Sequence, residues 1–187
     1  MDMQQLMSIM HFVEKLKDTT RHSFTSKGRQ ESVAEHSWRM AMLAYFVKDE
    51  FPEADIHKVI LMCLFHDLGE AFEGDIPCFE KKPEEENREI RMIHEWIREL
   101  PSPYCGELTQ LLQELCDRST VEAQLAYALD GLEVVLQHNE ADISTWNETE
   151  HHLLLEYAKE RVAFSQYLTE LRRVIRGETV GKIETQQ

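Results

Sequence analysis

Apolar residues recur along most of this chain at the three- and four-residue spacing of an α-helix, and the alternation typical of strands is nearly absent. This pattern predicts helices over residues 3–16, 32–50, 55–70, 83–100, 104–117, 121–138 and 147–175. Asp55 is the expected N-cap of the third helix, because its carboxylate can accept hydrogen bonds from the first backbone N–H groups. The polar segment 17–30 and the Gly- and Pro-containing segment 74–77 are expected loops.

These elements predict an all-α fold, a single helical bundle of six or seven helices. A chain of 187 residues can bury one substantial core and is rather short for two. We expect the domain to cover residues 1–176. The tail over residues 177–187 has no clear apolar stripe, so we expect it to fray.

The net charge excludes one broad class of partner. The chain carries 35 acidic and 20 basic residues, which gives a formal net charge of −15. Binding to DNA or RNA polymers depends on neutralising their phosphates, so no nucleic-acid-binding face is expected. A small anionic substrate is still compatible, because a bound dication and one or two arginines can reverse the field locally.

Hydropathy and cysteine usage bear on the compartment. No stretch of about 18 apolar residues predicts a membrane span, and the first twenty residues lack the apolar run of a signal peptide. None of the four cysteines forms a Cys-x-x-Cys pair, and we interpret all of them as reduced thiols: Cys63, Cys78, Cys105 and Cys116. We therefore expect a cytoplasmic protein that does not associate with membranes.

The pair His66-Asp67, followed by Glu70, interrupts the apolar run at the end of the third predicted helix. Burying charge is unfavourable unless the charge is paired or bound to a metal. Glu70 lies four residues after His66 and three after Asp67, which places the three side chains on one face of a continuous helix. The segment therefore predicts a metal site with a further carboxylate beside it.

Two more polar residues lie within apolar helices. His36 is next to the apolar stripe of the second predicted helix, and Asp130 is surrounded by apolar residues in the sixth. Taken singly, His36 can be a hydrogen-bonded core residue and Asp130 can be the acceptor of an arginine salt bridge. Together with His66 and Asp67 they provide two imidazoles and two carboxylates. Such a set suits one divalent ion such as Mn²⁺, Co²⁺, Fe²⁺ or Ni²⁺.

Three segments carry a specific resemblance: RQESVAEHS (29–37), HDLGEAFEGDIP (66–77) and LDGLE (129–133). They resemble the HD-domain metal-dependent phosphohydrolases, in particular the 5′-deoxynucleotidase branch. The resemblance implies an HD-domain bundle, commonly a homodimer, that binds one divalent ion, with Mg²⁺ and Zn²⁺ added to the candidate ions. The implied metal ligands are the four residues already singled out, His36, His66, Asp67 and Asp130.

The same resemblance implies roles for neighbouring residues. It implies that Glu70 and Asp75 assist the chemistry and that Arg21 contacts the substrate phosphate, whereas the tryptophan that follows this arginine in the family is His22 here. Phosphomonoester hydrolysis needs an activated water and a proton for the leaving oxygen. We assign the water to Glu70, and the proton or a sugar-hydroxyl contact to Asp75, with the two roles interchangeable.

Arg29 is a second candidate for phosphate binding, because a guanidinium group matches the oxygens of a phosphate. An ion pair between Arg29 and Glu31 or Glu35 is the alternative. Glu133, three residues after Asp130, either accepts a hydrogen bond from a metal ligand or lies exposed.

The predicted function is metal-dependent removal of the 5′-phosphate from (deoxy)nucleoside monophosphates, which makes a small nucleotide the expected partner. Three alternatives are left open. The first is an HD phosphohydrolase that acts on another nucleotide, such as a dNTP or (p)ppGpp. The second is a non-catalytic regulator that binds metal or nucleotide. The third is a scaffold, supported only by the acidic helix over residues 83–100. Apolar residues of the last predicted helix line either a dimer interface or the core: Leu154, Val162, Phe164 and Leu168.

Overall fold

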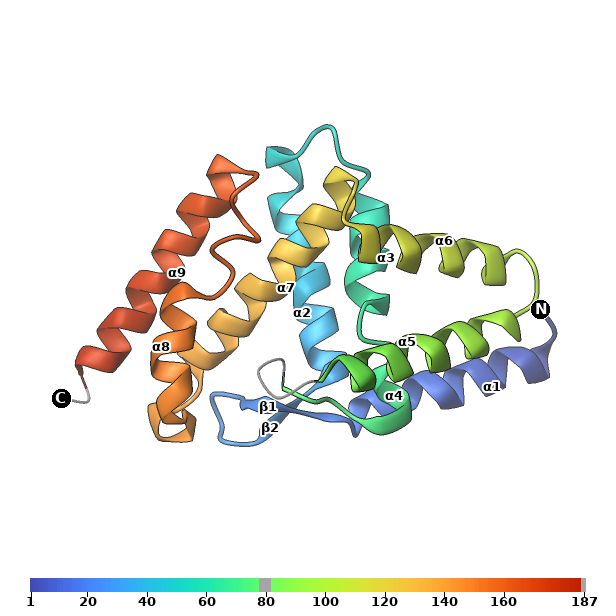
Figure 1. The fold of residues 1–187 in the computed structure, drawn as a ribbon, viewed down its shortest axis with the longest axis horizontal. Coiled ribbons are helices and arrows are strands. Elements are labelled where there is room, and N and C mark those ends of the chain that lie inside the picture. Colours follow the sequence, from blue (N-terminus) through green and yellow to red (C-terminus); the bar gives the residue numbers. More distant parts are fainter. Residues whose placement is uncertain (78–81, 186–187) are drawn as a thin grey trace.

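Helix α7 (Val121–Glu140) lies at the centre of the molecule. It contacts α2 (Val33–Val47), α3 (Ile56–Phe65) and α9 (Gln166–Glu184), and Figure 1 shows it crossing the bundle diagonally beside α2. Buried residues occur around most of its circumference, which is typical of a helix enclosed within a bundle. The functional side chains that α7 carries are therefore held by neighbours on several sides.

The structure is a computed structural model that describes residues 1–77 and 82–185. The helices around the core are α1 (Met3–Glu14), α4 (Glu70–Glu73), α5 (Pro83–Arg98), α6 (Tyr104–Asp117) and α8 (Glu148–Glu156). Short 3-10 turns lie at Lys15–Lys17, Lys48–Glu50 and Ile143–Thr145. Strands β1 (Thr20–Phe24) and β2 (Gln30–Ser32) form an antiparallel hairpin. In Figure 1, α1, α5 and α6 lie at the end that carries the N-terminus, and α8 and α9 lie at the opposite end.

Two hydrophobic clusters flank the segment that carries His66 and Asp67. The larger cluster contains Met62 and Cys63 of α3, together with residues from α2, α7 and α9. The smaller cluster contains Leu68 and Ala71, together with residues from α1, α5 and α6. The chain between Cys63 and Leu68 is therefore anchored at both ends. Close packing of these anchors holds the two polar side chains in a defined orientation.

Much of the predicted architecture is confirmed. The fold is all-α apart from the small hairpin, and α6 has the predicted bounds. Asp55 caps α3, with its carboxylate accepting a hydrogen bond of 3.0 Å from the backbone N–H of His57. No helix in the described residues is long and apolar enough to cross a membrane. In the same part of the chain no disulfide joins Cys63, Cys105 and Cys116, and Cys78 lies outside the described residues.

The expectation of a loop over residues 17–30 is wrong, because this segment supplies β1 and the turn of the hairpin. The side chains that the hairpin buries are polar: the hydroxyl of Ser23 donates to Glu31 at 2.8 Å, and both residues are buried. A strand that buries polar side chains shows no apolar alternation, so its sequence pattern resembles that of a loop.

The third helix ends at Phe65 rather than near Glu70. His66 is its C-cap, and the chain turns before α4 begins at Glu70. The backbone N–H of Leu68 bonds to the carbonyl of Phe65 at 3.2 Å, the spacing of a turn, while its side chain enters the smaller cluster. The argument that His66 and Glu70 share a continuous helical face is therefore wrong, although both remain close to Asp67 in sequence.

The last predicted helix is two helices. α8 ends at Glu156, and Ser165 caps the start of α9. Ala158 between them has a φ of 59°, in the left-handed region that interrupts a helix. Ala158 is buried, so it still satisfies the helical pattern of apolar positions. The pattern alone could not reveal this break.

The expectation of a frayed tail is also wrong over residues 177–184, where α9 continues. Thr179 in this part of the helix is fully buried, and its hydroxyl donates to the side chain of Asn139 on α7 at 2.9 Å. One polar contact of this kind attaches the helix to the core without an apolar stripe. Residues 186 and 187 lie outside the described part.

Candidate metal centre and active site

His66 presents one ring nitrogen to the centre of the bundle. Its Nδ1–H donates to the carbonyl oxygen of Cys63 at 2.9 Å, one turn back on α3. In a neutral imidazole this leaves the lone pair on Nε2. Nε2 lies 2.9 Å from Oδ2 of Asp67, the next residue along the chain.

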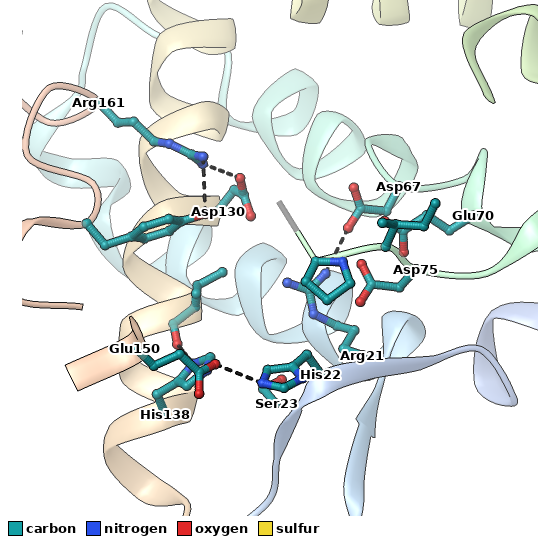
Figure 2. Close-up of a pocket in the computed structure, with 14 residues that line it drawn as sticks. Arg21, His22, Ser23, Asp67, Glu70, Asp75, Asp130, His138, Glu150 and Arg161 are labelled. Atoms are coloured by element: carbon teal, nitrogen blue, oxygen red, sulfur yellow. Dashed lines mark hydrogen bonds and ion pairs between the residues drawn. The ribbon is translucent and has the colours of Figure 1, made fainter. Parts of the chain in front are cut away.

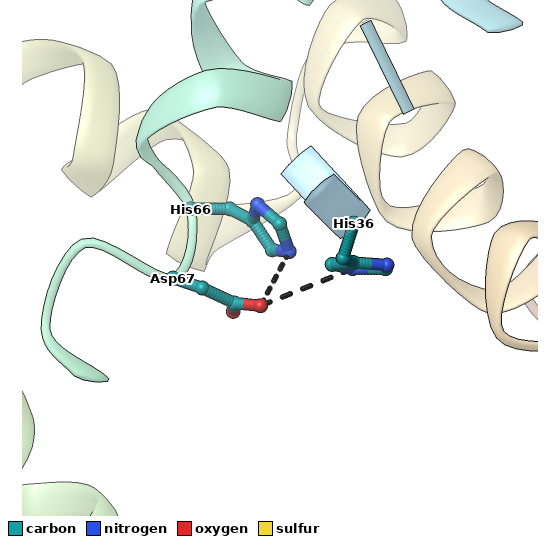
Figure 3. A group of neighbouring side chains, drawn as sticks. All are labelled: His36, His66 and Asp67. Atoms are coloured by element: carbon teal, nitrogen blue, oxygen red, sulfur yellow. Dashed lines mark ion pairs between the residues drawn. The ribbon is translucent and has the colours of Figure 1, made fainter. Parts of the chain in front are cut away.

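His36 approaches the same point from α2. Its side chain is fully buried, and its Nδ1 contacts Oε2 of the equally buried Glu133 on α7. Its Nε2 lies 3.3 Å from Oδ1 of Asp130 and 3.9 Å from Oδ2 of Asp67. Figure 3 shows the rings of His36 and His66 on either side of the Asp67 carboxylate. Glu133 therefore orients His36, as a hydrogen-bond acceptor commonly does for a metal-binding histidine.

The structure thus brings together the four residues that the sequence predicts as metal ligands. Ligand atoms of His36, His66 and Asp67 lie within 4.8 Å of one another. Both Nε2 atoms are buried and lack a hydrogen-bond partner among the described residues. Burying two such nitrogens is costly unless something binds them. Two imidazole nitrogens beside two carboxylates fit a divalent ion, which these four residues would hold: His36, His66, Asp67 and Asp130.

Electrostatics in the metal-free protein support this interpretation. Burial opposes ionisation of Asp67 and Asp130, but the neighbouring histidines, with Arg21 and Arg161 respectively, outweigh it and lower the pKa of both carboxyl groups. Burial and Arg21 oppose protonation of His36, but Asp130 and Glu133 outweigh them and raise its pKa to about 9. The two carboxylates are therefore ionised and compensated by nearby positive charge, as a cation site requires.

A cavity of about 180 Å³ opens beside this centre, and Figure 2 shows its lining. Arg21 reaches it from β1, with Nη1 at 3.1 Å from Oδ2 of Asp67 and Nε at 3.5 Å from Glu31. Glu70 and Asp75 also line the cavity. Three of the four predicted catalytic and substrate-binding residues therefore meet at the metal centre.

Glu70 is the most perturbed acid in the cavity wall. Its side chain is buried, and its Oε2 has no hydrogen-bond partner among the described residues. Burial, followed by the charges of Asp67 and Asp75, raises the pKa of Glu70 to about 10. Perturbed acids of this kind are common at catalytic sites, because proton transfer near neutral pH needs a shifted pKa.

Arg29 does not join the others. It is exposed on the surface, where its guanidinium pairs with the carboxylate of Glu35, and it does not line the cavity. Glu35 also accepts a hydrogen bond from the backbone N–H of Ser32 at the start of α2, which holds the ion pair on the outer side of that helix. This is the ion-pair alternative, and we do not retain Arg29 as a phosphate-binding residue.

Sequence reasoning missed several residues at this site. Arg161 pairs with Asp130, and Glu150 lies between His138 at 3.1 Å and His22 at 3.0 Å on the far side of the cavity. No spacing rule singles out an arginine between two helices. Glu150 resembles an ordinary capping residue, and it does cap α8 through the backbone N–H of Asn147.

Comparison with known proteins agrees with this geometry. A model of the HD-domain family matches residues 13–172, which is most of the chain. The chain belongs to the HD-domain family. HD domains are metal-dependent, in accord with the donor set of this HD domain.

Several relatives of this HD domain have names that state an activity. It is 32% identical over 141 residues to the 5′-deoxynucleotidase HDDC2 of Bos taurus, which is 73% of this chain and 68% of the relative. It is 34% identical over 133 residues to the 5′-deoxynucleotidase HDDC2 of Dictyostelium discoideum, which is 66% of this chain and 70% of the relative.

A solved structure has the same fold along almost its whole length. It is a "Predicted metal-dependent phosphohydrolase" from Magnetospirillum magnetotacticum MS-1, with a TM-score of 0.82 and 28% identity. The similarity covers 96% of this HD domain and 95% of that chain.

Proposed function

We propose that this HD domain hydrolyses the 5′-phosphate of (deoxy)nucleoside monophosphates. The observation that carries the proposal is the meeting of two orphaned imidazole nitrogens and two carboxylates beside a cavity that contains Arg21, Glu70 and Asp75. The names of the relatives support the choice of substrate. The cavity of about 180 Å³ gives no support to a longer triphosphate as substrate.

Each group at the site has a distinct part in the reaction. A bound divalent ion supplies charge neutralisation and lowers the pKa of a water molecule. Arg21 binds the phosphoryl oxygens through its guanidinium N–H groups. Glu70 holds the attacking water and accepts its proton as the new P–O bond forms. Asp75 gives a proton to the 5′-oxygen as the old P–O bond breaks, or binds a sugar hydroxyl, and the roles of the two acids are interchangeable.

We propose Mn²⁺, Co²⁺, Fe²⁺ or Ni²⁺ as the bound ion, with Mg²⁺ and Zn²⁺ as the other candidates. Imidazole and carboxylate donors accept each of these divalent ions, so the ligand set alone does not select among them. We also propose a cytoplasmic enzyme that binds neither membranes nor nucleic-acid polymers, in keeping with its net charge of −15.

A substrate screen tests the proposed function. Protein stripped of metal with a chelator is expected to be inactive, and reloading with Mn²⁺ or Co²⁺ should restore phosphate release from deoxynucleoside monophosphates. Phosphate is measured beside elemental analysis of the same sample. Release of pyrophosphate or triphosphate would indicate another HD phosphohydrolase. Bound metal without turnover of any monophosphate would indicate a regulator.

We propose in addition that the protein is a homodimer that uses the outer face of α2. Leu154, Val162 and Leu168, considered above for a dimer interface, are buried in the core instead. Helix α2 exposes an apolar stripe at helical spacing, which consists of Trp38, Met42, Tyr45 and Phe46. A two-fold axis would bring the same stripe from a second copy against it, and apolar contact can outweigh the mutual repulsion of two acidic chains.

Phe46→Glu is expected to convert the dimer into a monomer, because Phe46 is 72% exposed on this face and a carboxylate there would be buried on association. Light scattering coupled to size-exclusion chromatography measures the mass. Phe164→Glu is the matched control, because Phe164 is also exposed but lies between α8 and α9. Dissociation by the control alone would move the interface to that region.

A further inference from the structure

Arg161 has contacts that a surface arginine does not usually make. It lies in the segment between α8 and α9, and its Nη1 is 2.5 Å from Oδ2 of Asp130. Its Nη2 donates to the hydroxyl of Tyr157 at 3.3 Å, and its guanidinium carbon is 4.1 Å from the centre of the Tyr127 ring. The side chain is only 19% exposed. The guanidinium is therefore held from several directions.

The backbone is also arranged to bring this segment against α7. A Cβ atom on Gly131, the residue after Asp130, would lie 2.8 Å from the Cβ of Ala158 and 2.9 Å from the Cδ of Arg161. Both distances are too short for real contacts, so only glycine allows this approach. Ala158 has a positive φ of 59°, which turns the chain across α7 at this point. The approach of Arg161 to Asp130 therefore depends on features of the backbone as well as on charge.

Arg161 and Arg21 occupy equivalent electrostatic positions. Both line the cavity beside the metal centre, and among its described lining residues they supply the arginine or lysine side chains. Arg21 pairs with Asp67, and Arg161 pairs with Asp130. Figure 2 shows the two guanidinium groups reaching the cavity from opposite sides. An anion that enters the cavity therefore meets a cation on each side.

We propose that Arg161 binds the substrate phosphate together with Arg21, from the opposite wall of the cavity; this assignment rests on the proposed function. A guanidinium carries five N–H donors, and the contacts with Asp130 and Tyr157 account for two of them. A phosphomonoester dianion is surrounded here by Asp67, Glu70, Asp75 and Asp130, which repel it. Two charge-assisted hydrogen-bonding groups on opposite sides offset that repulsion and orient the phosphoryl group.

The competing role for Arg161 is purely structural: attachment of the segment between α8 and α9 to the core. Arg118 separates the two roles. Its guanidinium carbon lies 3.8 Å from the centre of the same Tyr127 ring. It lines an adjoining cavity of about 320 Å³ but is not among the residues that line the phosphate cavity. Arg118→Met removes the same charge and the same kind of aromatic contact, and so it is the matched control for Arg161→Met.

The primary measurement is the affinity of the manganese-loaded protein for inorganic phosphate, by titration calorimetry. Arg161→Met is expected to weaken phosphate binding by about tenfold to a hundredfold, the range for loss of a hydrogen bond to a charged group. Arg118→Met is expected to stay within about twofold of wild type. Elemental analysis should find manganese in both variants. Equal phosphate affinity in wild type and Arg161→Met, or an equal loss in both variants, would overturn the proposal.

Two further variants guard against a folding artefact. Arg161→Lys keeps the charge but not the planar group, and it is expected to bind phosphate more tightly than Arg161→Met and less tightly than wild type. Gly131→Ala displaces Arg161 without removing it, and it should also weaken phosphate binding. With a deoxynucleoside monophosphate as substrate, the loss in Arg161→Met should appear mainly in KM. Failure of the proposed function is distinguishable, because a protein that turns over no monophosphate can still show the difference in phosphate affinity.

Discussion

Asp67→Asn is expected to abolish metal binding and catalysis together. Oδ2 of Asp67 lies within 3.1 Å of both His66 Nε2 and Arg21 Nη1, so one carboxylate serves the proposed metal ligand and the phosphate-binding arginine. An amide of the same shape keeps the volume but loses the negative charge. We expect kcat/KM to fall by more than about a hundredfold, since loss of even an outer partner of a metal ligand costs about 10–100-fold.

The measurement combines kinetics with elemental analysis after dialysis against Mn²⁺. Asp49→Asn is the matched control, because it makes the same chemical change at a side chain that is 89% exposed. The control should retain wild-type metal content and rate. Full metal occupancy in Asp67→Asn would show that the ion is held elsewhere, and the proposed ligand set would be wrong.

Glu70→Gln is expected to separate catalysis from metal binding. If Glu70 accepts the proton of the attacking water, an amide cannot replace it, and kcat should fall by about 10²–10⁴-fold, the usual contribution of a general base. Metal content should stay at the wild-type level, because Glu70 is not among the proposed ligands. Glu73→Gln is the control: Glu73 lies one turn further on α4 and pairs with Arg88 away from the cavity. A full rate in Glu70→Gln would remove Glu70 from the mechanism.

The same variant has a predictable effect on the stability of the metal-free protein. The pKa of Glu70 rises from 4.5 to about 10 in the folded chain, so folding at neutral pH requires uptake of a proton. Wild-type protein should therefore lose stability, relative to Glu70→Gln, as the pH rises from about 4.5 towards 10. At pH 7 the difference should be on the order of 1–3 kcal/mol.

Urea unfolding in the presence of a chelator, at pH 5 and at pH 8, measures this difference. The two proteins should be similar at pH 5 and diverge at pH 8, with the variant more stable. Saturating Mn²⁺ should reduce the divergence, because a nearby cation favours the ionised carboxylate. A variant less stable than wild type at pH 8 would show that Glu70 is ionised in the folded, metal-free chain.

Local sequence was enough to locate the helices and the four proposed metal ligands. His36, His66, Asp67 and Asp130 are recognisable because a polar side chain inside an apolar helical run is costly to bury unless it is paired or binds a metal. The same local pattern also identified the bounds of α6 and the cap of α3. It failed where burial is polar, as in the hairpin, or where an apolar residue adopts a non-helical conformation, as at Ala158.

The tertiary structure alone decided which charged residues reach the site. Arg161 meets Asp130 across 31 positions of sequence, and His36 meets Glu133 across 97. Arg29, which lies in a segment similar to the family, is instead held outside by Glu35. Charged side chains are compatible with solvent almost anywhere on a helix or loop, so their sequence positions carry little information about their partners. An isolated charge in an apolar run is unfavourable wherever the chain folds, and for that reason the metal ligands were evident before the fold was known.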